Sequence, residues 1–233
     1  MTTTRAKTKT KDVSIPLTSG GRVTGRLTSA VAKPRVAIAL AHGAGSDLDA
    51  RLLVAVADGL AARGHAVLRF NFPYKERGGT APDKAPTLEA TWRDVAAWLR
   101  PRAEKLVIGG KSMGGRYASI VASKGLACGA LVFLGYPLHP ATKKGAKVDP
   151  AKLRDAHLPL VAAPMLFVSG TKDPLCDLAL LRPVLARVGP RAELVVVDGA
   201  DHDLGPPRSK ANPRDANDAA VIAAVDAFLS ARV

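Results

Sequence analysis

A serine with a glycine two residues away on each side marks the segment GGKSMGGR, residues 109–116. The pattern Gly-x-Ser-x-Gly is typical of a sharp turn between a strand and a helix, which exposes the serine hydroxyl as a nucleophile. Apolar residues 106–108 predict the strand, and residues 113–124 predict the helix. Small residues are needed at 110 and 114 because the chain reverses at Ser112 in a strained conformation. The segment therefore predicts a nucleophile at Ser112.

The same segment contains Gly-Lys-Ser, which also ends a phosphate-binding loop. Such a loop has another glycine five residues earlier, so that backbone N–H groups can surround the phosphates. Lys105 stands at that position, and an apolar run follows it. An apolar run there indicates a buried strand, so the phosphate loop is the weaker interpretation.

An acid and a base follow two later apolar runs. Asp173 comes after the run at 164–170, and His202 comes after the run at 194–197. Loops at the carboxyl ends of parallel strands meet at one edge of a sheet, so both residues can reach Ser112. His202 would take the proton of the serine hydroxyl, and Asp173 would hold the required histidine tautomer. Serine, aspartate and histidine in this chain order predict a catalytic triad.

Two backbone N–H groups are expected to stabilise the oxyanion that forms during acyl transfer. One belongs to Met113, at the start of the helix after the serine, where the helix dipole helps. The other is expected from Ala44, in the His-Gly-Ala-Gly loop that follows an apolar run at 36–40. Gly43 lets that loop approach a substrate closely, and His42 is expected to shape the loop.

Asp201 and Asp203 adjoin the candidate base, and we interpret both as loop or surface residues. The five histidines show no spacing typical of metal ligands. We therefore expect neither a metal nor a cofactor. The two cysteines, Cys128 and Cys176, cannot form a framework of several disulfides. They are expected to be buried or idle thiols in a reducing compartment, which favours the cytoplasm.

Strands and helices alternate from residue 35 onward. Alternation around a central run of apolar strands predicts a mostly parallel sheet with helices on both faces. An antiparallel hairpin around Ser-Gly-Gly is expected to precede it, over 12–17 and 21–29. The other expected strands lie within 35–45, 65–73, 129–137, 164–170 and 192–202, and the other helices within 49–64, 87–101, 175–189 and 215–233.

The chain of 233 residues suits one domain, which we place at 13–233. Residues 1–12 are threonine-rich and basic and predict a disordered tail. No apolar stretch follows them as in a secretory signal, and no apolar run approaches the roughly 20 residues of a membrane span.

The formal net charge of +14 permits contact with nucleic acid, anionic lipid or anionic substrates. Aromatic residues make up only 4% of the chain, and no nucleic-acid-binding motif is present. A solvated basic surface is therefore favoured over nucleic-acid binding.

The chain resembles α/β-hydrolases of the dienelactone-hydrolase-like kind. More narrowly, it resembles the family that includes a testis-expressed protein and a subunit of a histone-acetyltransferase complex. The resemblance lies in LAHGAGSD, LRFNFPY, GGKSMGGR, LGYPLHP, SGTKDPL and VDGADHDL, which span nearly all of the chain after the tail. It implies the α/β-hydrolase fold and supports Ser112, Asp173 and His202 as the triad. Dienelactone hydrolases proper have cysteine in place of this serine, which puts that particular activity in doubt.

The segment between the strands at 129–134 and 164–169 is too short for a large lid domain. We expect an open pocket, with Tyr74, Tyr136 and His139 as candidate walls. For His139 a structural hydrogen bond is favoured over a place in the wall. The nearby lysines 143, 144 and 147 suggest an anionic or polar ester.

The sequence thus favours a serine hydrolase that cleaves a small ester or thioester through an acyl-enzyme. The alternative is a hydrolase-fold interaction module with absent or incidental turnover. The sequence identifies neither the acyl group nor the oligomeric state.

Overall fold

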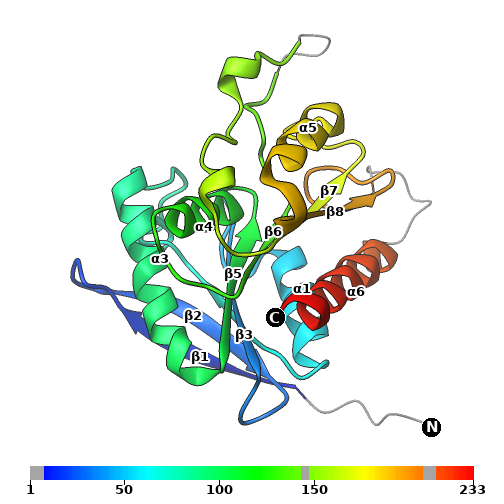
Figure 1. Ribbon diagram of the computed structural model, residues 1–233. Helices are drawn as coiled ribbons and strands as arrows, with labels where there is room; N and C mark the ends of the chain where they lie inside the picture. The colour runs from blue at the N-terminus through cyan, green and yellow to red at the C-terminus, as the bar shows by residue number, and fades with distance from the viewer. Residues whose placement is uncertain (1–7, 143–146, 207–213) are drawn as a thin grey trace, which may run out of the picture.

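The computed structural model describes residues 8–142, 147–206 and 214–233. A sheet of eight strands, in the order β1-β2-β4-β3-β5-β6-β7-β8, forms its centre (Figure 1). β1 and β2 pair antiparallel, β2 pairs antiparallel with β4, and the pairs from β4 to β8 are parallel. The strands are β1 Lys9–Pro16, β2 Arg22–Ser29, β3 Val36–Ala41, β4 Ala66–Phe70, β5 Lys105–Lys111, β6 Ala130–Leu134, β7 Met165–Gly170 and β8 Ala192–Val197.

Helices cover both faces of this sheet (Figure 1). Side chains of α3, α4 and α5 pack in one hydrophobic cluster, and side chains of α1 and α6 pack in a second. The helices are α1 Arg51–Ala61, α2 Pro73–Glu76, α3 Ala85–Leu99, α4 Met113–Ser123, α5 Leu178–Val188 and α6 Arg214–Arg232. The predicted mostly parallel sheet, with helices on both faces and an N-terminal hairpin, is confirmed.

The central strands read as continuous apolar runs because both of their faces are covered. Every residue of β3 is buried. Ile38 and Leu40 pack with α1 and α6, whereas Ala37, Ala39 and Ala41 pack on the opposite face. This alternation follows from the two-residue period of a strand. Burial on both faces holds the carboxyl end of β3, and the loop that follows it, in a fixed place.

The predicted tail, 1–12, extends too far along the chain. β1 begins at Lys9, and its backbone pairs with β2 from Lys9 opposite Ser29 onward. Backbone pairing does not require apolar side chains, so a polar segment can extend an edge strand. Thr10 also bonds to Thr28, and Arg26 forms an ion pair with Asp12. Residues 1–7 of the expected tail lie outside the described residues.

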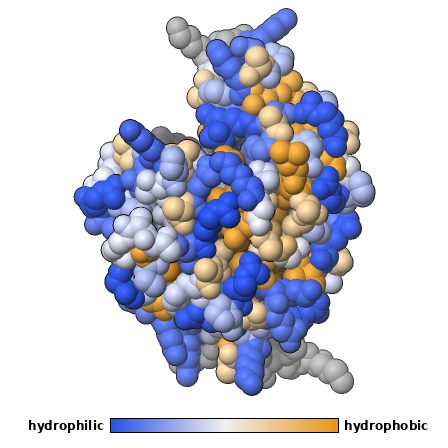
Figure 2. Space-filling view, turned by 60° about the vertical axis from the view of Figure 1, so that its left-hand side comes forward, coloured by the Kyte–Doolittle hydropathy of each residue, from blue (hydrophilic) through white to orange (hydrophobic). Residues whose placement is uncertain are grey.

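Between β6 and β7 the described residues form two short 3-10 helices, η2 Pro150–Lys152 and η3 Leu158–Leu160, rather than a lid domain. Two further 3-10 helices are η1 Arg100–Arg102 and η4 Gly189–Arg191. Polar residues spread over much of the face shown in Figure 2, with apolar residues between them. In the part of the chain that the structure describes, no helix has the length and apolar character to cross a membrane.

Candidate active site

Ser112 occupies a sharp turn between β5 and α4. Its φ of 49° and ψ of −116° are unusual for a residue with a side chain. A Cβ atom on Gly110 would lie 2.1 Å from the carbonyl oxygen of Ala41, and one on Gly114 would lie 2.3 Å from the same oxygen. Both positions therefore need glycine, because β3 passes too close for any side chain. The turn is the strained strand-to-helix geometry that the segment predicted.

Ser112, His202 and Asp173 form a continuous chain of hydrogen bonds. His202 Nε2 lies 2.8 Å from Ser112 Oγ, and His202 Nδ1 lies 2.8 and 2.9 Å from the two oxygens of Asp173. With Nδ1–H donating to the carboxylate, Nε2 is free to accept the serine proton. The Asp173 side chain is fully buried and that of His202 is 18% exposed. A buried carboxylate holds the ring in this tautomer, while the ring edge near Ser112 remains accessible.

The loop after β7 fixes Asp173. Its Oδ1 accepts the N–H of Leu175 at 2.8 Å, in addition to the His202 proton. Cys176 lies buried beside it, and burial raises the pKa of the Cys176 thiol to about 12. The thiol next to the acid is therefore protonated at neutral pH.

Two glycines allow the loop with His202 to approach the sheet. A Cβ atom on Gly135, where φ is +66°, would lie 2.6 Å from the His202 carbonyl oxygen. One on Gly170 would lie 2.1 Å from the Ala200 carbonyl oxygen. Asp201 accepts the N–H groups of Asp203 and Gly205, at 2.9 and 3.2 Å, and so stabilises its own turn. Asp201 therefore stabilises the loop and is not the partner of the histidine.

Hydrogen bonds of the buried His42 ring brace the loop after β3. His42 Nδ1–H donates to the Gly43 carbonyl at 2.8 Å, and the Phe72 N–H donates to His42 Nε2 at 3.2 Å. The bond from Phe72 requires a neutral ring, because Nε2 must accept, and burial lowers the pKa of His42. The Tyr74 hydroxyl contacts the backbone of Gly45. His42 and Tyr74 thus hold the loop without entering the pocket.

Two N–H groups near Ser112 remain without a protein acceptor among the described residues. One belongs to Ala44 in the braced loop, and the other belongs to Met113 in the first turn of α4. The first N–H groups of a helix have no partner within the helix and attract negative charge. The Gly43 Cα is also close to Ser112, since a Cβ there would lie 3.5 Å from Ser112 Cβ. Both N–H groups are therefore available to donate to a bound ligand.

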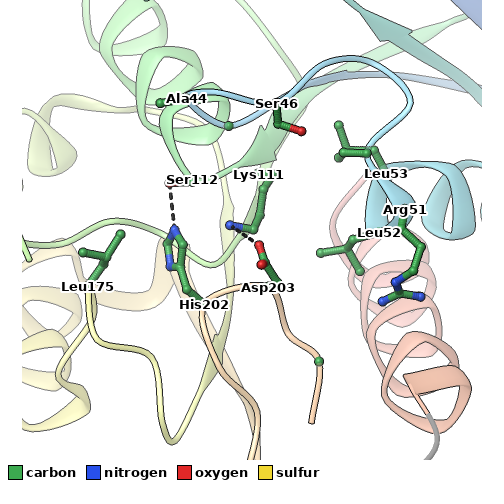
Figure 3. A pocket seen from close by; sticks show the side chains of 13 residues that line it. Ala44, Ser46, Arg51, Leu52, Leu53, Lys111, Ser112, Leu175, His202 and Asp203 are labelled. Atoms are coloured by element: carbon green, nitrogen blue, oxygen red, sulfur yellow. Dashed lines mark hydrogen bonds and ion pairs between the residues drawn. The ribbon is translucent and has the colours of Figure 1, made fainter. Parts of the chain in front are cut away.

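A cavity of about 450 Å³ opens beside Ser112 (Figure 3). Leu52 and Leu53 lie on one side of it, and Leu175 lies on the other side, beyond His202. Its lining consists of Gly43, Ala44, Ser46, Ala50, Arg51, Leu52, Leu53, Lys111, Ser112, Leu175, His202, Asp203 and Gly205. The structure therefore brings four of the predicted residues to this wall, namely Gly43, Ala44, Ser112 and His202.

The predicted aromatic walls and His139 do not line the cavity. Tyr74, Tyr136 and His139 are at most 2% exposed. The Tyr136 hydroxyl donates to the Arg154 carbonyl at 2.6 Å, and the Asp177 N–H donates to His139 Nε2 at 3.1 Å. Their polar atoms are used inside the fold, so the prediction of Tyr74 and Tyr136 as walls was wrong. The hydrogen bond of His139 matches the structural role favoured for it. His42, which is fully buried, is also absent from the lining.

Sequence reasoning missed two cations in the wall. Lys111 precedes the candidate nucleophile, and its ammonium lies 3.1 Å from Asp203 Oδ1. Arg51 Nη2 donates to Asp218 Oδ1 at 3.0 Å. The position of Lys111 next to Ser112 was a visible signal. Of the three lysines expected at the mouth, 143 and 144 lie outside the described residues, and 147 is exposed but not part of the lining.

A second serine–histidine contact lies elsewhere. Ser119 Oγ is 2.7 Å from His157 Nε2 and also donates to the Arg116 carbonyl. Ser119 is completely buried in the middle of α4. It has helical geometry and no place in the cavity wall, so this contact joins α4 to η3 and does not present a nucleophile.

Comparison with known proteins finds solved structures of the same fold. A dienelactone hydrolase from Anabaena variabilis superposes with a TM-score of 0.74 at 20% identity, over 97% of this chain and 99% of that chain. A serine hydrolase without lid from Xanthomonas campestris gives 0.69 at 18% identity, over 95% of this chain and 94% of that chain. An esterase from Pyrococcus furiosus gives 0.72 at 20% identity, over 96% of this chain and 93% of that chain.

These likenesses show a shared fold. A family model described as an alpha/beta hydrolase domain matches residues 34–230, from the start of the parallel sheet to the closing helix. The chain therefore belongs to the alpha/beta hydrolase family.

Proposed function

We propose that the protein is a serine hydrolase that cleaves a small ester or thioester through an acyl-enzyme. Ser112 is the nucleophile, His202 is the general base and Asp173 orients the histidine. The observation that carries this proposal is the continuous chain from Asp173 through His202 to Ser112, with hydrogen bonds of 2.8 to 2.9 Å, at the wall of a cavity. The contact between Ser119 and His157 has no such cavity beside it, because Ser119 is completely buried.

Acylation begins when Ser112 Oγ attacks the carbonyl carbon and its proton passes to His202 Nε2. Asp173 stabilises the imidazolium that forms. The negative oxygen of the tetrahedral intermediate accepts the N–H groups of Ala44 and Met113, which are fixed before the substrate arrives. When the intermediate collapses, His202 gives the proton to the departing alcohol or thiol.

Deacylation repeats these steps with water as the nucleophile. His202 takes one proton of the water, the hydroxide adds to the acyl carbon, and Ser112 leaves with the proton from the imidazolium. The products are a carboxylic acid and the regenerated serine. A cavity of about 450 Å³, over which the described residues form no lid domain, suits a small acyl group better than a long chain.

A fluorophosphonate probe tests this proposal because it bonds to an activated serine and releases fluoride. We expect wild-type protein to be labelled, Ser112→Ala to be unlabelled, and Ser119→Ala to be labelled as wild type. The last variant is a matched control, since it removes the other serine in contact with a histidine. Labelling that persists in Ser112→Ala would contradict the assignment of the nucleophile.

If folded wild-type protein is not labelled, the better interpretation is an interaction module on a hydrolase scaffold. The preference for anionic esters, the cytoplasmic location and the narrower likeness to the testis-expressed subtype stay predictions from sequence.

A further inference from the structure

An ion pair runs beside the hydrogen bond between the proposed nucleophile and base. Lys111 immediately precedes Ser112, and Asp203 immediately follows His202. The Lys111 ammonium lies 3.1 Å from Asp203 Oδ1, and Ser112 Oγ lies 2.8 Å from His202 Nε2. Figure 3 shows the two interactions next to each other in the cavity wall. The end of β5 is thus joined to the loop after β8 at two successive residues.

The two partners of this ion pair differ in burial. The Lys111 side chain is 9% exposed, whereas that of Asp203 is 78% exposed. Burial lowers the pKa of the Lys111 ammonium, and the nearby carboxylates of Asp203, Asp173 and Asp201 counter that effect. Removing a charge from water costs free energy, so an apolar side chain of similar length would pack here at lower cost. Stability alone therefore gives no reason for a lysine at this position.

The loop with His202 has no regular secondary structure, so contacts must hold it in place. On the side of the sheet, the Lys172 N–H donates to the Ala200 carbonyl, and Gly135 and Gly170 permit close approach. Those contacts restrain the loop where it meets the sheet. Lys111 reaches it from the cavity side, through Asp203.

We propose that Lys111 is a positioning residue, which acts through Asp203 to keep His202 Nε2 in line with Ser112 Oγ. This inference rests on the proposed function. Catalysis depends steeply on such geometry, because a shift of about 1 Å can cost about 100-fold in rate. Lys111 need not touch the substrate to have this effect.

The test compares Lys111→Met, Asp203→Asn and the double variant, with Lys124→Met as control. Lys124 also pairs with a carboxylate, Glu89 at 2.7 Å, but does not line the cavity. We expect each single variant to lower kcat and the rate of probe labelling by about 10- to 100-fold, with little change in KM. The double variant should lose no more than the worse single variant, because both remove the same interaction.

Thermal unfolding separates positioning from a loss of folding. In Lys111→Met, Asp203 stays at an exposed site and buried Asp173 keeps its bonds to His202 and the Leu175 N–H, so the Tm should equal or exceed that of wild type. Asp203→Asn, at an exposed site, provides a second variant that does not disturb the core. Wild-type kcat in Lys111→Met, or multiplied losses in the double variant, would overturn the proposal.

Lys111 could instead bind an anionic group of the substrate. Hydrolysis of 3-acetoxybenzoate and of its neutral methyl ester distinguishes this role. Positioning predicts equal losses for both esters in Lys111→Met, and a loss confined to the anionic ester would overturn it. The His202 Nδ1–H resonance, identified by its absence in Asp173→Asn, should broaden or shift in both single variants. This signal requires no turnover, so it tests Lys111 even if Ser112 is not labelled.

Discussion

The carbonyl oxygen of His202 lies 2.6 Å from the point that a Cβ atom on Gly135 would occupy. Gly135 follows β6, and its φ of +66° is one that residues with side chains rarely adopt. The backbone of the proposed base therefore rests directly on the end of a central strand.

Gly135→Ala should reduce activity far more than stability. The new methyl group must displace the His202 backbone, so we expect kcat and probe labelling to fall at least about 10-fold. The positive φ should cost about 1 to 2 kcal/mol in the free energy of unfolding. Gly125→Ala is the control, because its φ is +87° but its Cβ would meet nothing within 4 Å. Equal activities of the two variants would contradict close packing behind His202.

Asp173→Asn should lower kcat by about 1,000-fold or more while the fold is retained. A neutral amide neither stabilises the imidazolium nor selects the tautomer with Nδ1–H. Steady-state kinetics and probe labelling measure the effect. Asp198→Asn removes the charge of an exposed carboxylate that bonds to Thr171, and it should behave as wild type. A loss of less than about 10-fold in Asp173→Asn would exclude this carboxylate as the orienting acid.

The sequence predicted the sheet and the residues that meet at its edge because both depend on local patterns. Apolar runs predicted the strands, and the glycines at 110 and 114 predicted the turn. The close approach of the Ala41 carbonyl explains why both positions need glycine. The chain order of Ser112, Asp173 and His202 correctly indicated that they meet, although their catalytic roles stay predictions.

The walls of the cavity depend on packing and could not be predicted in the same way. Tyr74 and Tyr136 follow strands, as cavity residues do, but their rings turn into the core. Tyr74 packs against His42, and Tyr136 packs against Phe133 and Phe167. Lys111 was overlooked because a lysine at the end of a strand usually points into solvent. Here its side chain is 9% exposed, and only the fold brings Asp203 to it.

Both cysteines should resist alkylation in the folded protein. Burial raises the pKa of the Cys128 thiol and of the Cys176 thiol to about 12, so the reactive thiolate is scarce below that pH. Iodoacetamide at pH 8 should label neither residue in native buffer and both in denaturant, as measured by mass spectrometry. Rapid labelling of Cys176 in native buffer would show that the loop with Asp173 opens readily.

Acid should destabilise the fold through His157. Burial, with a contribution from Arg116, lowers the pKa of His157 to about 4. The unfolded chain takes up a proton at this residue near pH 6.5, whereas the folded chain does so only near the lower value. The stabilisation from the neutral ring is therefore complete above about pH 6.5 and declines as the pH falls toward 4.

His157→Gln should reduce this dependence on pH, because glutamine can still bond to Ser119 but takes up no proton. We expect wild-type protein to lose about 1 to 2 kcal/mol more than the variant between pH 7 and pH 4.5, after allowance for solvent screening at a partly exposed ring. Urea unfolding at the two pH values measures the loss of stability in each protein. The carboxylates are common to both proteins, so their contribution cancels when the two losses are compared. Identical losses in the two proteins would mean that His157 titrates alike in the folded and unfolded chains. In that case burial and Arg116 would not oppose a charge on the ring.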